Sequence, residues 1–361
     1  KTKFLKNQKK EKTSRDFTEP VYSDMTEDHS INMAWHNVTN AAANNAVQQV
    51  LASTSGLTTI APTWFSLADT EGNISSIADA DYVNYAHTAG LEVWAVFRDF
   101  HGGTNSYDET YETLRYTSKR AKLEDQVVAA AVAAGVDGIN LDFELISSKC
   151  GVHYVQLVRE LSVKCHQNNL VFSVDNYVPQ SYNSHYDLKE QGIVADYVVI
   201  MAYDEHTEGS YEAGSVASIS YLQDGIEKTL KKVSADKVIA GIPFFTRLWF
   251  ETAKSPEQLS EEAGTEAASY PNKVSSKALG MEEAAQSVVN AGATAQWDEK
   301  TQQNYAKWSA DGGTYRIWLE DAQSLEAKLK AIQENKLAGV AEWSLGKEES
   351  SVWKLISQYV N

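Results

Sequence analysis

The sequence has little cysteine and no long apolar run. Its 361 residues include two cysteines, Cys150 and Cys165, at the two ends of one segment with helical spacing. A helix of that length holds their Cα atoms roughly 22 Å apart, whereas a disulfide needs about 7 Å or less, so we expect two free thiols. No stretch approaches the roughly 20 apolar residues that cross a bilayer. We therefore expect no transmembrane segment, and no signal or anchor segment, in this chain.

Motifs that mark several common enzyme classes are also missing. No GxGxxG, GxxxxGKS/T or GxSxG occurs, which removes the commonest nucleotide-binding and serine-hydrolase interpretations. The eight histidines include no HxH or HExxH pair with the spacing of metal ligands. We expect neither a metal site nor a cofactor.

Positive charge is scarce outside the first residues. The chain has 32 Lys and Arg against 49 Asp and Glu, a net charge of -17, although residues 1–15 carry seven Lys or Arg and one Glu. An acidic body repels a phosphate backbone, so nucleic acid is not an expected partner. We interpret residues 1–20 as a basic tail or linker and residues 21–361 as the catalytic domain.

Eight short β-rich runs alternate with segments of helical spacing, which is typical of βαβ units. The runs are residues 31–37, 57–65, 91–98, 137–144, 170–177, 196–203, 237–245 and 338–345. Regular alternation favours an α/β fold, a closed (β/α)8 TIM barrel. The alternative is a doubly wound open sheet, but such a sheet usually has a Gly-rich loop after its first strand, where this chain has Trp35-His36-Asn37.

One connection is much longer than the others. About seventy residues separate the seventh run from the helix before the eighth, and residues 304–310 and 314–320 flank an Asp-Gly-Gly turn within it. We predict a small α+β insertion at about residues 249–318. Because it follows the C-terminal end of a barrel strand, it is expected to lie beside the active-site mouth.

The most informative segment is DGINLDFE, residues 137–144. In a strand, Asn140, Asp142 and Glu144 share one face and the apolar residues between them share the other. Two carboxyl groups this close in a partly desolvated interior retain a proton over a wide pH range. The segment therefore predicts a general acid, with Glu144 nearest the C-terminal rim where barrel enzymes carry out their chemistry.

At this segment the chain resembles glycoside hydrolase family 18, the chitinase-like family, whose fourth strand carries DGxDxDxE. Three further segments agree in order: MAYD at 201–204, GIPFFTR at 241–247 on the seventh strand, and GVAEWS at 339–344. The finer likeness is to bacterial cell-wall and spore-cortex N-acetylglucosaminidases, through AWH at 34–36, MAYDEH at 201–206, TRLW at 246–249 and QWD at 296–298. Asn140 departs from the Asp of many chitinases. It cannot ionise and is expected to hydrogen-bond to Asp142.

The resemblance implies substrate-assisted catalysis with Glu144 as general acid and base. Asp142 is expected to align the sugar's acetamido group, and Tyr203 and Asp204 to hold it from the other side. Trp343 is expected to form the floor on which the sugar stacks. The remaining expected substrate-binding residues are Asn140, Arg247, Trp64 and Trp297. For Arg247 the alternative is pairing with a barrel carboxylate, and for the aromatic residues it is packing in the core.

These observations predict a retaining glycoside hydrolase that cleaves β-1,4-linked N-acetylglucosamine polymers, with peptidoglycan favoured over chitin. One alternative is a chitinase that acts on chitin oligomers, and another is a catalytically silent, glycan-binding relative. A wall-anchored structural module is a third, argued from the basic tail alone. We expect a monomer that is extracellular or associated with a bacterial cell wall.

Overall fold

The computed structural model describes residues 25–100 and 103–360. The predicted basic tail, residues 1–20, lies outside the described residues. Within them, no helix is long and apolar enough to span a membrane. Cys150 and Cys165 are both buried and both free, which confirms the predicted thiols.

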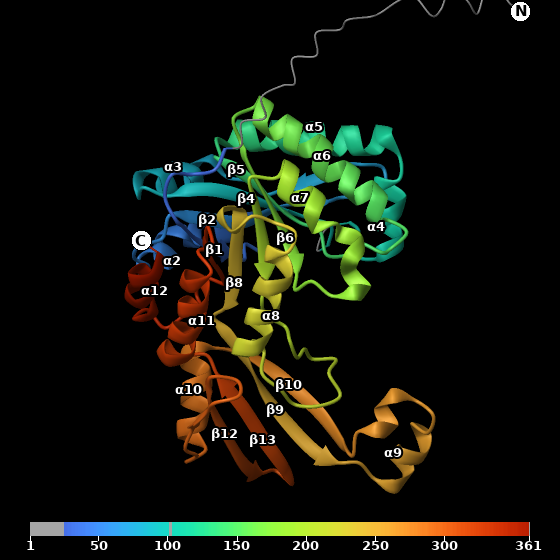
Figure 1. The fold of residues 1–361 in the computed structure, drawn as a ribbon, viewed down its shortest axis with the longest axis vertical. Helices are drawn as coiled ribbons and strands as arrows, with labels where there is room; N and C mark the ends of the chain where they lie inside the picture. The colour runs from blue at the N-terminus through green and yellow to red at the C-terminus, as the bar shows by residue number, and fades with distance from the viewer. Residues whose placement is uncertain (1–24, 101–102, 361) are drawn as a thin grey trace, which may run out of the picture.

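Eight parallel strands form a closed barrel, which confirms the predicted fold class (Figure 1). Their order is β1-β14-β8-β7-β6-β5-β4-β2, and pairing of β1 with β2 closes the ring. A short antiparallel strand, β3 (Ile74–Ser76), extends β2 on its outer side. The barrel strands are β1 (Ile31–His36), β2 (Thr59–Leu67), β4 (Glu92–Arg98), β5 (Gly138–Asp142), β6 (Val171–Tyr177), β7 (Tyr197–Met201), β8 (Val238–Pro243) and β14 (Gly339–Trp343).

Helices cover the outside of the barrel, as the alternating sequence pattern predicts. Short 3-10 turns lie at Ala41–Ala46 (η1), Ser181–Tyr186 (η2) and Ala235–Lys237 (η3). The helices are α2 (Val47–Leu51), α3 (Ala80–Thr88), α4 (Tyr107–Leu114), α5 (Thr117–Ala134), α6 (Gly151–Gln167), α7 (Leu188–Val194), α8 (Ile219–Leu230), α11 (Ala322–Glu334) and α12 (Val352–Val360).

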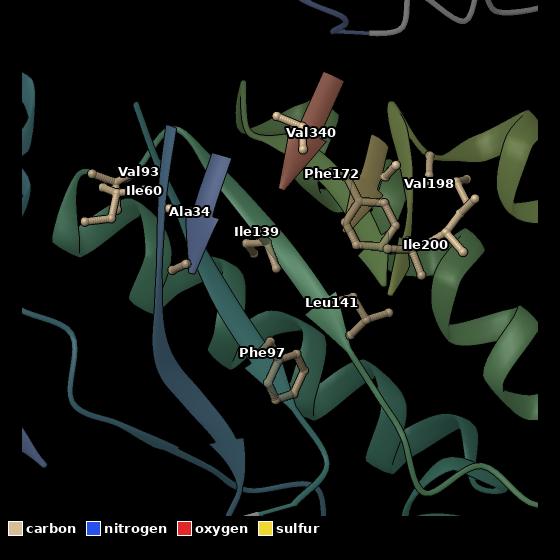
Figure 2. Packing of buried hydrophobic residues seen from close by; sticks show 14 of the residues in the cluster. Ala34, Ile60, Val93, Phe97, Ile139, Leu141, Phe172, Val198, Ile200 and Val340 are labelled. Atoms are coloured by element: carbon tan, nitrogen blue, oxygen red, sulfur yellow. The ribbon is translucent and has the colours of Figure 1, made fainter. Parts of the chain in front are cut away.

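Alternation along β5 separates the apolar core from the polar interior. Ile139 and Leu141 are fully buried in the layer between strands and helices, together with Phe97 and Phe172 of the neighbouring strands (Figure 2). The intervening polar side chains therefore point into the barrel. Gly138 begins the strand, and a Cβ there would stand 2.8 Å from the indole ring of a neighbouring tryptophan. Any residue larger than glycine at this position would therefore overlap the indole ring.

A second, five-stranded antiparallel sheet follows β8, in the order β10-β9-β13-β12-β11. It lies at one end of the barrel (Figure 1). The predicted hairpin forms β12 and β13, with positive φ at Asp311 and Gly312 in its turn. The elements are β9 (Phe245–Ala253), α9 (Pro256–Glu261), η4 (Glu266–Ser269), β10 (Asn272–Gly280), α10 (Met281–Asn290), β11 (Gln296–Asp298), β12 (Gln303–Ala310) and β13 (Gly313–Leu319).

The insertion begins earlier than the sequence predicts. Strand β8 ends at Pro243 and β9 starts at Phe245, four residues before the expected start at residue 249. Arg247 and Trp249 therefore belong to the inserted sheet and not to the seventh barrel strand. The indole N–H of Trp249 donates to the carbonyl of Gly214 at 2.8 Å, which ties the sheet to the loop that follows β7.

Candidate active site

A cavity of about 180 Å³ opens at the C-terminal ends of the barrel strands, where barrel enzymes place their chemistry. Its lining combines carboxyl groups with aromatic rings and a single guanidinium. The lining residues are Trp35, Asn37, Arg98, Phe100, Asp142, Glu144, Asp175, Tyr177, Met201, Tyr203, Asp204 and Trp343. The structure thus brings together Glu144, Asp142, Tyr203, Asp204 and Trp343, all of which the sequence nominates.

Glu144 lies two residues beyond the end of β5, in a loop held from both sides. The sequence places it within the strand, but the strand ends at Asp142. The backbone N–H groups of Glu144 and Leu145 donate to the two carboxylate oxygens of Asp99, at 2.8 and 2.9 Å. The Tyr186 hydroxyl donates to the carbonyls of Phe143 and Glu144 at 3.2 and 3.1 Å. These bonds fix the backbone that carries the side chain.

The carboxyl group of Glu144 is placed to hold a proton. Burial raises its pKa, and the charge of Asp204 raises it further. The Tyr177 hydroxyl donates to Oε2 at 2.5 Å and opposes this rise, because it stabilises the charged form. A raised pKa keeps the group protonated toward neutral pH, as a general acid requires.

Asp142 lies deeper in the same cavity and is only 8% exposed. Burial raises its pKa well above the usual range, as do the charges of Glu144 and Asp175, while the Arg98 guanidinium opposes the rise. Its Oδ1 atom is buried and has no hydrogen-bond partner among the described residues. A buried carboxyl oxygen without a partner is a ready acceptor for a ligand N–H.

Asn140 lies beneath the cavity and does not line it. It accepts from the indole N–H of Trp35 at 3.0 Å and donates to Ser173 at 2.9 Å and to Asp175 at 2.7 Å. The expected hydrogen bond to Asp142 is absent among these contacts, so that prediction is wrong. The side-chain amide of Asn140 is fully buried, and its oxygen and NH2 group are bonded to these polar neighbours inside the barrel.

The wall opposite the carboxyl groups is aromatic. Trp35 contacts the ring of Tyr203 edge to face at 6.4 Å and the ring of Trp343 at 6.0 Å. The peptide bond after Trp343 is cis. Partial burial raises the pKa of Asp204, opposed by the positive charges of Arg247 and Lys347. A ring-lined recess beside acidic groups suits a sugar, whose C–H faces are apolar and whose edges carry hydrogen-bonding groups.

The family model of glycosyl hydrolases family 18 matches residues 35–348 of this chain. The chain belongs to this family. It is 26% identical over 295 residues to the uncharacterized glycosylase YvbX of Bacillus subtilis, a match that covers 79% of this chain and 80% of YvbX. It is 27% identical over 256 residues to the cortical fragment-lytic enzyme of the same organism, where the match covers 68% of this chain but 54% of the relative.

Solved structures share the fold of this family 18 glycosidase. The C-terminal domain of a putative chitinase from Desulfitobacterium hafniense superposes with a TM-score of 0.78 at 19% identity, over 92% of this chain and all of that domain. The spore cortex-lytic enzyme SleL of Bacillus cereus superposes with a TM-score of 0.77 at 20% identity, over 92% of this chain and 74% of SleL. Both confirm the barrel.

Two tryptophans nominated for the glycosidase cleft lie elsewhere. Trp64 is 2% exposed, packs edge to face on Tyr82 at 4.9 Å and donates to Asn44 at 2.8 Å in the layer outside the barrel. The prediction that it binds substrate is therefore wrong. Trp297 is on β11 of the inserted sheet, paired with Asn304, and does not line the cavity.

Arg247 lies near the cavity without lining it. Its Nη1 donates to Ser276 on the neighbouring strand β10 at 2.9 Å, whereas its Nε is buried and has no partner among the described residues. Its positive charge acts on Asp204. From the inserted sheet it therefore favours the ionised form of Asp204. Its contact with sugar remains a proposal.

Sequence reasoning missed several lining residues of this glycosidase, Arg98 and Tyr177 among them. Arg98 and Tyr177 are the last residues of β4 and β6. Both residues were predicted to be the last of their strands. The C-terminal end of a barrel strand lies at the mouth of the barrel, so this position alone could have indicated them. The positioning residue Asp99 follows directly after Arg98, where no motif distinguishes it from an ordinary loop carboxylate.

Proposed function

We propose that this family 18 glycosidase is a retaining enzyme that cleaves β-1,4-linked N-acetylglucosamine polymers by substrate-assisted catalysis. One observation carries the proposal: a carboxyl group with a raised pKa, Glu144, shares a cavity with Asp142, whose buried Oδ1 has no partner. The first is equipped to deliver a proton and the second to accept a hydrogen bond from an amide.

Glu144 acts twice in the proposed reaction. It donates its proton to the departing glycosidic oxygen while the acetamido oxygen of the sugar bonds to the anomeric carbon and the glycosidic bond breaks. Its carboxylate then takes a proton from water, and that water opens the oxazolinium ring. Two inversions at one carbon retain the anomeric configuration.

Asp142 makes the acetamido group an effective nucleophile. Its free Oδ1 accepts the amide N–H, which aligns the carbonyl oxygen and stabilises the positive charge that develops on the ring. Arg98 lies in the same cavity and favours the ionised form of Asp142.

Aromatic and polar groups on the opposite wall hold the reacting sugar. Trp343 and Trp35 offer apolar surface to the ring, and Tyr203 lies between Trp35 and Phe245 with edge-to-face contacts to both. Packing on both sides fixes the direction of the Tyr203 hydroxyl. Tyr203 and Asp204 then contact the acetamido group from the side opposite Asp142.

Peptidoglycan is the polymer we favour. The relatives include a cortical fragment-lytic enzyme and a putative sporulation-specific glycosylase, YdhD, of Bacillus subtilis. The matches span little more than half the length of these two relatives, 54% and 57%, so their whole activity is not carried over directly. An enzyme of this kind acts outside the cell or at the cell wall.

Product analysis tests the substrate and the bond. Purified protein is incubated with peptidoglycan fragments and with chitin oligomers, and the new reducing ends are reduced with borotritide and identified. The proposal predicts reducing N-acetylglucosamine ends from peptidoglycan. Reducing N-acetylmuramic acid ends, or no new ends from either polymer, would overturn it.

A thiazoline analogue of N-acetylglucosamine tests the mechanism separately. Because this compound resembles the oxazolinium intermediate, it should inhibit competitively and bind more tightly than N-acetylglucosamine itself. Indifference to the thiazoline in an enzyme that still cleaves the polymer argues for a nucleophile other than the acetamido group.

A further inference from the structure

Two cationic side chains lie at the border between the barrel mouth and the inserted sheet. Arg247 belongs to β9, and Lys347 lies in the loop that follows β14. Partial burial raises the pKa of Asp204, and the positive charges of both cations oppose this rise. Asp204 lines the active-site cavity, whereas neither cation does. The two cations are therefore close enough to act on the rim of the cavity from outside it.

Phe245 relates the positions of these two cations. It lies two residues before Arg247 on β9, so the two side chains share one face of the strand. The Lys347 ammonium lies 5.3 Å from the centroid of the Phe245 ring, and Tyr203 meets the same ring edge to face at 6.2 Å. The Lys347 carbonyl also accepts from the backbone N–H of Met281 at 2.8 Å. The ammonium is thus held beside the wall of the cavity that Tyr203 forms.

The charge of each cation lacks a close counter-ion. Among the described residues, neither Arg247 nor Lys347 forms an ion pair. Nη1 of Arg247 donates to the neutral hydroxyl of Ser276, and its Nε is buried without a partner. Burial lowers the pKa of Lys347; Asp204 opposes this fall and the charge of Arg247 adds to it. Holding two like charges in a partly buried place costs free energy, so this arrangement indicates an anionic ligand.

Nearby glutamates do not supply the missing negative charge. Lys347 also borders a hollow lined by Glu282, Glu283 and Glu348. Glu283 pairs with Lys277 at 2.8 Å, and Glu348 accepts from a backbone N–H at 2.7 Å. Asp204 contributes at most one negative charge against the two positive ones. This part of the rim therefore has a local surplus of positive charge, although the chain as a whole is acidic.

The rest of the cavity limits what the anion is attached to. Asp142, Glu144 and Asp175 line the interior, so an anionic group there meets like charge. A neutral sugar ring with one carboxylate directed at the rim satisfies both parts of the site. The Nε edge of a guanidinium matches the two oxygens of a carboxylate, and a lysine ammonium adds a further charged donor.

We propose that Arg247 and Lys347 form an anion site that binds a carboxylate of the N-acetylmuramic acid next to the reacting sugar. This inference rests on the proposed function and names the feature that separates peptidoglycan from chitin at this site. Two sources supply the same chemistry, the lactyl group of the muramic acid and the stem peptide attached to it. Chitin has neither. The site therefore selects the polymer by a contact that the reacting N-acetylglucosamine does not itself make.

The test compares three tetrasaccharides of alternating N-acetylglucosamine and N-acetylmuramic acid. The first has free lactyl carboxylates, the second has lactyl carboxamides, and the third carries L-alanine, with its own free carboxylate, on each lactyl group. We expect wild type to prefer a carboxylate form over the carboxamide. Lys347→Met should lower that ratio of kcat/KM values about tenfold, because a charge-assisted contact is lost.

Lys354→Met is the matched control for this variant. Lys354 is an exposed lysine of α12 that lines neither the cavity nor the hollow beside Lys347, and the substitution changes the net charge equally. The ratio should stay as in wild type. Measuring every protein at about 150 mM salt keeps long-range repulsion common to all of them.

Each outcome decides the proposal. Preference for the free lactyl form assigns the lactyl group, and preference for the alanyl form assigns the stem peptide. Equal kcat/KM of wild type on all three glycans overturns the site, as does an equal loss on all three in Lys347→Met, since the lysine then only balances Asp204. Cleavage of the N-acetylglucosamine tetramer but of no muramic acid glycan also overturns it.

Failure of the proposed function is distinguishable from failure of the anion site. If wild type cleaves none of these glycans, the proposed function fails on its own. Calorimetric binding of the carboxylate and carboxamide glycans then decides the site. The site requires that wild type bind a carboxylate form more tightly and that Lys347→Met lose this difference, and equal affinities refute it.

Discussion

At the scale of single residues, the candidate active site depends on the position of the Glu144 carboxyl group. That position is set by hydrogen bonds to the backbone and by nearby charges. Asp99 accepts hydrogen bonds from the backbone N–H groups of Glu144 and Leu145, which lie on either side of the Glu144 Cα, and Thr110 donates to the same Asp99 carboxylate at 3.1 Å. Burial raises the pKa of Asp99 to about 7, although the hydrogen bonds it accepts from the backbone oppose the rise. The backbone of Glu144, the proposed acid, is therefore held by a residue that is itself fully buried and does not line the cavity.

Asp99→Asn tests this positioning role. The amide retains one acceptor but turns an NH2 group toward the other backbone N–H, so the loop shifts. We expect kcat to fall about 10- to 100-fold with little change in KM, because small displacements of a catalytic group are costly and substrate-binding groups stay in place. Steady-state kinetics measure this, with Asp108→Asn as the exposed control. A fall in thermal stability with an unchanged kcat would mean that Asp99 is only structural.

Tyr177→Phe tests the electrostatics of the acid. The variant keeps the ring but removes the hydroxyl that lowers the pKa of Glu144. The folded pKa of Glu144 then rises further, so the acid stays protonated to higher pH. The alkaline limb of the pH profile of kcat/KM should move to higher pH. A shift to lower pH, or none, would show that another group sets that limb.

Sequence reasoning brought Glu144, Asp142, Tyr203, Asp204 and Trp343 to one cavity, because fixed spacing and strand alternation determine where such side chains point. It failed at Trp64 for a physical reason. Strand β2 is buried along its whole length, so its sequence has no polar face to indicate direction, and its pairing with β4 shifts register between Thr63 and Phe65.

At the scale of elements, the inserted sheet was predicted in part. The β12–β13 hairpin follows from alternation and an Asp-Gly-Gly turn. Strand β10 was missed because its residues are mostly polar and only Leu279 is fully buried, so it has no clear apolar face. Strand β9 was missed because Phe244 alone separates β8 from β9 in a continuous apolar run. The start of the insertion, and with it the place of Arg247, could not be read from periodicity.

A buried ion pair joins the end of this insertion to helix α11. Glu320 and Lys328 are 2% and 1% exposed and lie 3.0 Å apart. Gln303 of β12 and Ser324 donate to the same Glu320 carboxylate, at 2.7 and 2.8 Å. Burial raises the pKa of Glu320, and Lys328 opposes this rise. The pair thus ties the end of β13 to α11 and, through Gln303, to β12.

Lys328→Met should be strongly destabilising. It leaves a buried carboxylate without its cation, which costs about 3 kcal/mol of unfolding free energy at neutral pH. Since a carboxyl group with a raised folded pKa favours the folded state while protonated, the loss should be smaller at about pH 5 than at about pH 8. Urea unfolding at both pH values measures this. Adding Glu320→Gln should recover part of the loss, and a loss independent of pH would contradict the argument.

At the scale of the whole molecule, net charge distinguishes the two polymers that are candidate substrates under the proposed function. The net charge is -17 over 361 residues. Peptidoglycan fragments carry carboxylates, whereas chitin oligomers are neutral. Both polymers contain the sugar that the cavity is proposed to bind. Long-range electrostatic repulsion should therefore slow association with peptidoglycan fragments and leave association with chitin oligomers unchanged.

Raising ionic strength should therefore affect the two substrates differently. Between about 10 mM and 150 mM salt the screening length falls from about 30 Å to about 8 Å. We expect kcat/KM for acidic peptidoglycan fragments to rise severalfold and that for chitin oligomers to stay constant. A fall with salt on peptidoglycan would point to attraction by a basic region instead.

The most direct test of the central claim is the turnover of Glu144→Gln on the N-acetylglucosamine tetramer. Glutamine keeps the size of the side chain and cannot deliver a proton, so kcat should fall about a thousandfold while the tetramer still binds. The exposed carboxyl of Asp108, changed to Asn, should leave kcat as it is. If Glu144→Gln turns over the tetramer at the rate of the wild type, residue 144 is not the acid and the proposed mechanism is wrong.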